Sequence, residues 1–181
     1  DKGGLLNIGP ESAGSNPGPV AYGLGNTRPT VTDANIVLGR IDPDNPIGGK
    51  LVRLDVEAAS KAIDEHVGKP LKLDTLAAAE AILTVANSRM AGAIRLVSIE
   101  RGFDPNRFAF MPVGGGGALH AGAMLAETGI ARAIVPRYPG VTSAMGCVIA
   151  DMQQDFVKTI NTLVDTLDKV EMADFMETHH D

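Results

Sequence analysis

The sequence predicts an α/β protein, because one region has the order strand, glycine loop, helix and strand. Residues 107–113 form an apolar run that contains two phenylalanines and is bounded by turn residues, which is typical of a buried strand. Four glycines, Gly114 to Gly117, separate this run from an alanine-rich helix expected over 118–127. A second apolar strand is expected over 131–135. This order predicts a βαβ unit with parallel strands and a right-handed crossover.

Two longer helices are expected before this unit. The first spans residues 55–67, with Asp55 as its N-cap and Gly68 as the residue that ends it. Its apolar face consists of Val56, Ala59, Ile63 and Val67. The second runs from about residue 76 to 101. Asp74 or Thr75 caps it and Gly102 follows it, and its apolar stripe consists of Leu76, Ala79, Leu83, Ala86, Met90, Ile94 and Val97.

The first fifty residues are rich in glycine, proline, asparagine and aspartate. The stretch 9–19 can hardly hold a regular element, and a long ordered loop within a domain is usually functional. A short helix is expected after it, with Thr32 or Asp33 as its N-cap. Near the other end, Thr142 or Ser143 caps a helix that continues to about residue 150, and residues 156–176 have a helical pattern.

Composition excludes several classes of function. The formal net charge of −6, without any basic run, argues against nonspecific binding of nucleic acid. The single cysteine, Cys147, excludes an internal disulfide and a cysteine-based metal cage. We find no apolar run long enough to span a membrane and no signal peptide, so we expect a cytoplasmic protein. Three histidines have no spacing that supports a metal site: His66, His179 and His180.

The glycine run is the strongest functional candidate, with two interpretations open. Backbone N–H groups at a helix start carry partial positive charge, and without Cβ atoms the backbone can approach a phosphate, ribose or base closely. Alternatively, the run is a tight turn that needs glycine for packing. A P-loop is excluded because Ala118 and Leu119 follow Gly117, and the Gly-x-Gly-x-x-Gly pattern fails in both registers. Any nucleotide would therefore bind in a third way.

Five sequence blocks in the same order resemble the hydantoinase A / 5-oxoprolinase family. They cover about residues 5–155, and together they are far more specific than any one of them alone. The blocks are Gly9–Pro19, Pro29–Asn35, Ser98–Pro105, Gly114–Ala121 and Pro139–Gly146. The family usually has proline at the position of Ala118. This departure leaves the entry to the following helix less rigid.

The resemblance implies an actin-like (ribonuclease H-like) ATPase domain that uses ATP and Mg²⁺. Residues 1–155 would form its C-terminal portion, and 156–181 the start of a following helical segment, in a fragment of a longer chain. In that fold Gly114 to Gly117 would contact the adenosine part of ATP. The two phosphate-binding hairpins of the fold are not found in this sequence, so we expect the chain to be inactive by itself.

The resemblance also implies a reaction class. The family includes ATP-dependent 5-oxoprolinase and hydantoinases, which open a cyclic amide and work with a partner subunit of the hydantoinase B type. Two alternatives stay open: the ATPase subunit of an acetone-type carboxylase, and a nucleotide-binding module without turnover of its own. The sequence assigns no catalytic residue and no resident metal site.

Four more residues are candidates for the site. His120, in the first turn after the glycines, either orients ATP or the lactam, or has a structural role in holding a neighbouring loop. Asp33 either contacts Mg²⁺ or a phosphate-bound water, or caps a helix. Glu11 and Ser12 are expected to line a site, because they lie in the long ordered loop.

Overall fold

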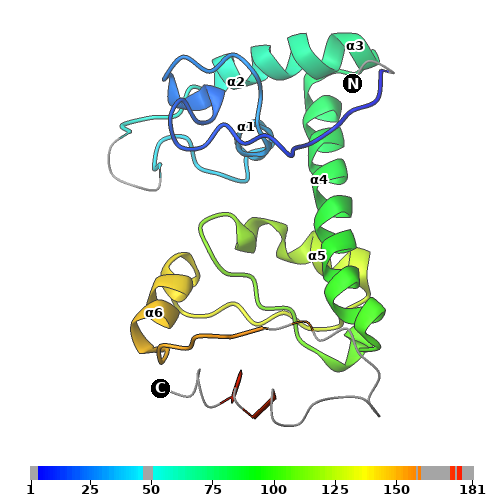
Figure 1. Ribbon diagram of the computed structural model, residues 1–181. Helices are drawn as coiled ribbons and strands as arrows, with labels where there is room; N and C mark the ends of the chain where they lie inside the picture. The colour runs from blue at the N-terminus through cyan, green and yellow to red at the C-terminus, as the bar shows by residue number, and fades with distance from the viewer. Residues whose placement is uncertain (1–3, 47–50, 158, 160–171, 174, 177–181) are drawn as a thin grey trace. The chain divides into compact units, whose positions relative to one another are not determined.

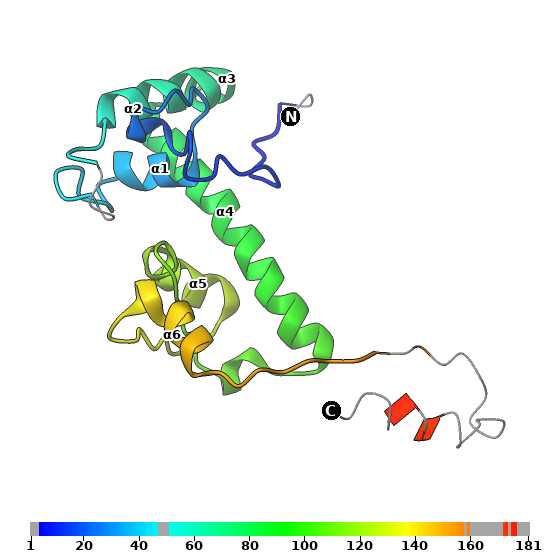
Figure 2. The same ribbon diagram turned by 60° about the vertical axis from the view of Figure 1, so that its left-hand side comes forward.

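The computed structural model describes residues 4–46, 51–157, 159, 172–173 and 175–176 (Figures 1 and 2). The chain divides into two compact units, Asp1–Ser143 and Ala144–Asp181, and the boundary falls within the helix α6 (Thr142–Ile149). Each unit is considered by itself. The expected helical pattern over 156–176 lies mostly outside the described residues.

The described residues are mainly helical. The first half of the chain holds the 3₁₀ turn η1 (Val20–Tyr22), α1 (Val31–Val37), α2 (Val56–Ile63), the π-helical turn η2 (Asp64–Gly68), α3 (Lys69–Leu71) and α4 (Thr75–Ser98). The second half holds the 3₁₀ turns η3 (Ile99–Arg101), η4 (Pro105–Arg107), η5 (Gly117–His120) and η6 (Pro139–Val141), with α5 (Ala121–Thr128) and α6 (Thr142–Ile149).

Helix α1 begins two or three residues earlier than the predicted N-caps, Thr32 and Asp33, would place it. Its N-cap is Thr30, whose hydroxyl accepts the Asp33 backbone N–H while the Asp33 carboxylate accepts the Thr30 N–H. This capping box satisfies two backbone donors at once, which explains why the helix starts at Val31. The prediction of Thr32 or Asp33 as N-cap was therefore wrong, although Asp33 does belong to the cap.

The helix predicted over 55–67 starts where expected but does not end at Gly68. Asp55 caps α2 by accepting the Ala58 N–H at 2.9 Å, and the helical path then continues through η2 and α3. It ends at Lys72, which has a left-handed backbone with φ 56°. Gly68 has a packing role, because a Cβ there would lie 3.1 Å from the Asp64 carboxylate and 3.1 Å from the Leu73 carbonyl.

Helix α4 is the longest element and matches its prediction at both ends. Asp74 accepts the Ala77 N–H at 2.8 Å, and the turn η3 closes on Gly102, which has φ 78°. The buried face is rotated from the predicted stripe. Of that stripe Ala79, Leu83 and Ala86 are buried, whereas the exposed members are Leu76, Met90 and Val97.

The main core lies where α1, α2 and the first half of α4 meet. One cluster joins Ala34 of α1, Ile63 and Val67 from α2 and η2, and four residues of α4, namely Ala78, Ala79, Ile82 and Leu83. A second cluster joins Ala21, Ile36, Leu54 and Ala59. Burial of these side chains supplies most of the driving force for folding in this part of the chain. The small alanines let the helices approach closely.

The two expected strands, 107–113 and 131–135, are reduced to one parallel bridge between Phe110 and Ala133. Phe110 donates its N–H to Arg132 at 2.9 Å, and its carbonyl accepts the Ile134 N–H at 2.8 Å. Extension of this ladder would next require N–H groups from residues 112 and 136, which are prolines and have none. The parallel pairing is thus confirmed, but no extended strand forms in the described part of the chain.

The helix after the glycines forms as η5 and α5 and ends at Gly129, as predicted. Helix α6 begins directly after η6, and the Thr142 hydroxyl donates to the Tyr138 carbonyl instead of capping the helix. By length and composition, Thr75–Arg101 could cross a membrane, contrary to the expectation from sequence. Core helices meet the same criterion, and one face of the first half of α4 packs in the main core, so this is weak evidence for a membrane span.

Candidate functional site

The first glycine of the loop has a structural reason to be glycine, and the last one packs against a neighbouring proline. Gly114 has φ 85°, a left-handed backbone that side chains disfavour, and its N–H donates to the Pro139 carbonyl at 2.8 Å. Gly117 lies against Pro112, and a Cβ added to Gly117 would be 3.6 Å from the Pro112 backbone, which is an ordinary van der Waals contact. These two contacts fix the ends of the loop between the bridge and α5.

The two middle glycines have no such reason. Gly115 and Gly116 are exposed, and a Cβ added to either would meet nothing within 4 Å. Their N–H groups donate to no acceptor within the described residues. A tight turn that needs glycine for packing therefore does not explain these two positions. The open surface and the available donors favour the interpretation that the loop receives a ligand.

His120 connects this loop to α4. Its ring Nδ1 lies 2.8 Å from the Asn87 Oδ1, and both residues are 7% exposed. Because a carbonyl oxygen can only accept, this contact places the ring proton on Nδ1 and leaves a lone pair on Nε2. The only fully buried side-chain polar atom without a partner in the described residues is Asn35 Oδ1, so Nε2 keeps some contact with solvent.

Burial lowers the pKa of His120 below its ordinary value of 6.5, and the positive charge of Arg40 lowers this pKa further. His120 is therefore neutral at neutral pH, in agreement with the tautomer that the Asn87 contact requires. The arrangement offers a hydrogen-bond acceptor, Nε2, close in sequence to the free N–H donors of the loop. The hydrogen bond with Asn87 supports a structural role for His120, and its neutral ring leaves the ligand-binding role open.

Helix α5 runs alongside the second half of α4 and in the same direction. His120 at its start contacts Asn87, and the Glu127 carbonyl near its end accepts a hydrogen bond from Arg95. These two contacts, one at the middle of α4 and one about two turns further along it, hold α5 at both of its ends. They thereby fix the position of the glycine loop that precedes it.

Asp33 has a structural role in the capping box and beyond it. Its carboxylate is fully buried and accepts hydrogen bonds from the N–H groups of Val20, Ala21 and Thr30 at 3.1, 2.9 and 2.8 Å. It also accepts the Thr30 hydroxyl at 2.8 Å. Both oxygens are therefore occupied within the chain. The predicted contact with Mg²⁺ stays a prediction, and it would require some of these hydrogen bonds to break.

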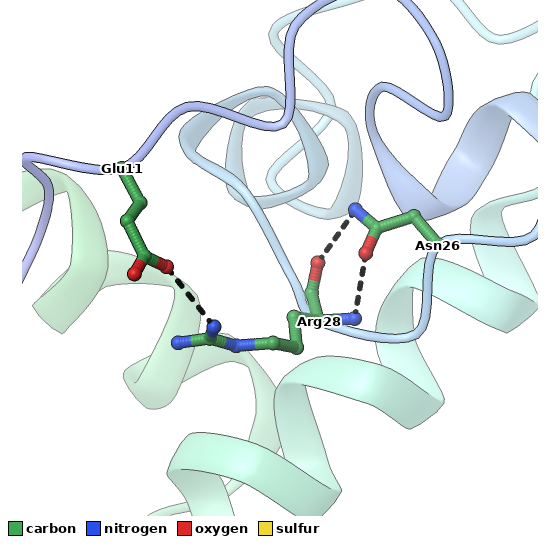
Figure 3. A network of polar contacts seen from close by, with 3 residues as sticks. All are labelled: Glu11, Asn26 and Arg28. Carbon is green, nitrogen blue, oxygen red and sulfur yellow. Dashed lines mark hydrogen bonds and ion pairs between the residues drawn. The ribbon is translucent and has the colours of Figure 1, made fainter.

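Glu11 and Ser12 line a cavity of about 1040 Å³ that is formed entirely within the first unit. Its walls come from the segment 4–14, from residues 28–32, and from helical residues that include His66, Val67 and Ile82. Glu11 pairs with Arg28, with 3.3 Å between Oε2 and Nη1, as Figure 3 shows. Ser12 accepts the Gly14 N–H at 3.1 Å.

The predicted site residues thus fall into three places. Gly114 to Gly117 and His120 lie together before α5, Glu11 and Ser12 line the cavity, and Asp33 is buried in the first turn of α1. No group of three His, Cys, Asp or Glu side chains able to hold a metal ion occurs among the residues that the structure describes.

Sequence reasoning missed Asn87 and Arg28. An asparagine beside the apolar stripe of a long helix is a signal that could have identified Asn87, because a polar side chain there needs a buried partner. No signal in the sequence pointed to Arg28, since it becomes relevant only when the loop brings it to Glu11.

The family model for hydantoinase/oxoprolinase matches residues 1–156 of this chain. The chain belongs to the hydantoinase/oxoprolinase family. Caprolactamase subunit alpha from Pseudomonas jessenii is 40% identical to it over 162 residues, which cover 90% of this chain and 23% of that protein. The crystal structure of the ATP-dependent caprolactamase from the same organism is similar with a TM-score of 0.76 at 41% identity, covering 84% of this chain and 22% of that one.

Other members of the hydantoinase/oxoprolinase family are similar at comparable levels. The acetophenone carboxylase gamma subunit from Aromatoleum aromaticum is 42% identical over 147 residues, which cover 81% of this chain and 20% of that protein. A 5-oxoprolinase from Dictyostelium discoideum is 34% identical over 168 residues, covering 85% of this chain and 13% of that protein. The chain therefore spans less than a quarter of the length of these three relatives.

Proposed function

We propose that this chain is part of an ATP-dependent enzyme that hydrolyses a cyclic amide, and that its glycine loop binds the adenosine part of ATP. The observation that carries the proposal is the pair Gly115 and Gly116, which expose backbone donors where no packing requires glycine. His120, with its neutral ring, ends the 3₁₀ turn that follows these two glycines. The caprolactamase and 5-oxoprolinase relatives support the reaction class.

The residues present fit an adenosine moiety. The glycine N–H groups can donate to its ring nitrogens or ribose oxygens, and the Nε2 of His120 can accept from an amino or hydroxyl group. ATP, when bound, supplies the phosphoryl group that activates the oxygen of an otherwise unreactive amide. The role of this chain is to position the nucleotide. Mg²⁺ would accompany the phosphates, and no residue of this chain is assigned to it.

We assign residues 1–155 to the C-terminal portion of an actin-like ATPase domain and 156–181 to the segment that follows. The family match over 1–156 supports this boundary. The assignment places the phosphate-binding hairpins outside the chain, so we expect the 181 residues alone to release no ADP from ATP. We also propose a partner subunit of the hydantoinase B type, since the caprolactamase and acetophenone carboxylase relatives are themselves named as subunits.

A carboxylase subunit is a second candidate, because the acetophenone carboxylase relative is 42% identical and the caprolactamase relative 40%. An assay of ADP release by the full-length protein with its partner separates the two. A cyclic amide such as ε-caprolactam or 5-oxoproline should stimulate release under the first proposal. Stimulation only by a ketone with bicarbonate would replace it with the second.

The role of the loop is tested with Gly115→Leu in the full-length protein. The added side chain occupies the open surface, so the KM for ATP should rise at least about tenfold while folding is unchanged. Gly92→Leu is the matched control, because Gly92 is also exposed and also has nothing within 4 Å of an added Cβ. Equal ATP affinity in both variants would rule out the adenosine role of the loop.

A further inference from the structure

We propose that the cavity lined by Glu11 and Arg28 binds the cyclic amide itself, with this ion pair recognising the N–H and C=O edge of the ring. The inference rests on the proposed function and names a substrate site for it. The cavity, of about 1040 Å³, is open to solvent on one side and lies slightly above the usual range of about 300 to 1,000 Å³ for small-molecule pockets, so it has room for a lactam ring with substituents. The lining combines apolar side chains such as Val67, Leu71 and Ile82 with the charged pair.

The ion pair is placed to bind a ligand, and it contributes little to stability. The side chains of Arg28 and Glu11 are 78% and 84% exposed, and such exposed pairs contribute at most about 1 kcal/mol to folding. Only Nη1 and Oε2 meet, at 3.3 Å. As Figure 3 shows, the second carboxylate oxygen and the other terminal guanidinium nitrogen make no contact with each other or with Asn26, and both side chains belong to the cavity lining.

The backbone that carries Arg28 is held in place by Asn26. The Asn26 side chain accepts the Arg28 N–H at 3.0 Å and donates to the Arg28 carbonyl at 2.9 Å. It also donates to the Gly18 carbonyl at 2.6 Å, which ties this turn to the preceding loop. The three bonds reduce the conformational freedom that the arginine would lose on binding a ligand.

A cyclic amide is complementary to this pair. A small ring forces the amide into the cis form, so its N–H and C=O lie on the same edge. The guanidinium can then donate to the carbonyl oxygen while the carboxylate accepts the N–H, and both hydrogen bonds are strengthened by charge. An open-chain amide is trans and presents the two groups on opposite edges, so it can satisfy only one partner at a time. The pair therefore selects for the ring form.

The test measures binding of ε-caprolactam to the full-length protein without ATP. Arg28→Met and Glu11→Met should each weaken binding at least about tenfold, because each removes one charge-assisted hydrogen bond. Arg53→Met is the matched control. Arg53 forms an ion pair of 2.8 Å with Asp44 at similar exposure, outside the cavity lining, so its loss should leave binding unchanged.

A change in the ligand separates recognition from general disturbance. N-methylcaprolactam lacks the N–H, so it should bind the wild type more weakly than caprolactam and should lose little further affinity in Glu11→Met. Additive losses from methylation and Glu11→Met would overturn the proposed contact. Unchanged caprolactam affinity in Arg28→Met would overturn the site.

The two proposals fail in distinguishable ways. Arg28→Met should leave the KM for ATP unchanged, whereas Gly115→Leu should leave binding of caprolactam unchanged. If the protein hydrolyses cyclic amides but Arg28→Met does not change this activity, the proposed function stands and the proposed substrate site is wrong. If the wild-type protein binds none of ε-caprolactam, 5-oxoproline and hydantoin, both proposals are wrong.

Discussion

Replacement of Asp33 by alanine should destabilise the chain more than loss of any exposed helix cap. The carboxylate is fully buried and accepts three backbone N–H groups and one hydroxyl. Two of those donors belong to the buried residues Val20 and Ala21. A buried donor left without an acceptor costs about 1 to 3 kcal/mol, and a lost helix cap costs about 1 kcal/mol. Asp33→Ala should thus lower the free energy of unfolding by roughly 3 to 7 kcal/mol.

The assay is denaturation by urea followed by circular dichroism, with the slope of the transition compared between variants. Asp55→Ala is the control, because Asp55 caps α2 with a single bond to the Ala58 N–H and is exposed. Its loss should cost about 1 kcal/mol. Asp33→Asn should fall between the two, since an amide has only one acceptor oxygen.

Equal losses for Asp33→Ala and Asp55→Ala would refute the reasoning from buried donors. An Asp33→Ala variant with unchanged stability that loses ATP-dependent activity in the full-length protein would instead support the contact of Asp33 with Mg²⁺. The role as a buried acceptor therefore predicts a large loss of stability in Asp33→Ala, whereas a contact with Mg²⁺ alone predicts a loss of activity without it.

Three more predictions follow from single residues. Because the pKa of His120 is lowered from 6.5, its unfolded form binds a proton first as the pH falls. The contribution of His120 to stability is therefore complete above pH 6.5 and is lost as the pH falls toward the pKa of the folded form. The difference in the free energy of unfolding between wild type and His120→Gln, measured by denaturation, should therefore change between pH 7.5 and 5. A difference that stays constant over this range would contradict the lowered pKa. Lys72→Gly should raise the free energy of unfolding by about 0.5 to 1 kcal/mol, because an exposed left-handed residue at φ 56° favours glycine, and a lower melting temperature would contradict this. Gly114→Ala should cost about 1 kcal/mol through its φ of 85°, whereas Gly115→Ala, which has no positive φ, should have little effect on denaturation.

The helix ends could be predicted from sequence because local chemistry determines them. Asp55 and Asp74 cap their helices as expected, and Gly102 and Gly129 end theirs. The prediction failed at Gly68, where the absence of a Cβ serves a packing contact within the helix instead of its end. The sequence alone does not show whether a glycine ends a helix or allows a close packing contact within it.

The strands and the site depended on contacts between distant residues. Phe110 and Ala133 pair as expected, but the prolines at 112 and 136 remove the next two donors of the ladder, which a hydrophobic pattern does not reveal. The glycine loop could be predicted from its order along the chain. The bond between His120 and Asn87, residues 33 positions apart, could not, because it depends on how α5 lies on α4.

Helix α4 also determines how far apart the two proposed sites lie. Ile82 lines the cavity, and Asn87, five residues later, holds His120 at the glycine loop. At 1.5 Å of rise per residue, the two positions are about 7.5 Å apart along the helix axis. A hydrogen-bonded helix resists stretching, so this axial spacing does not depend on whether either site is occupied. A ligand that displaces α4 as a rigid body at one of these positions would therefore move the other position as well.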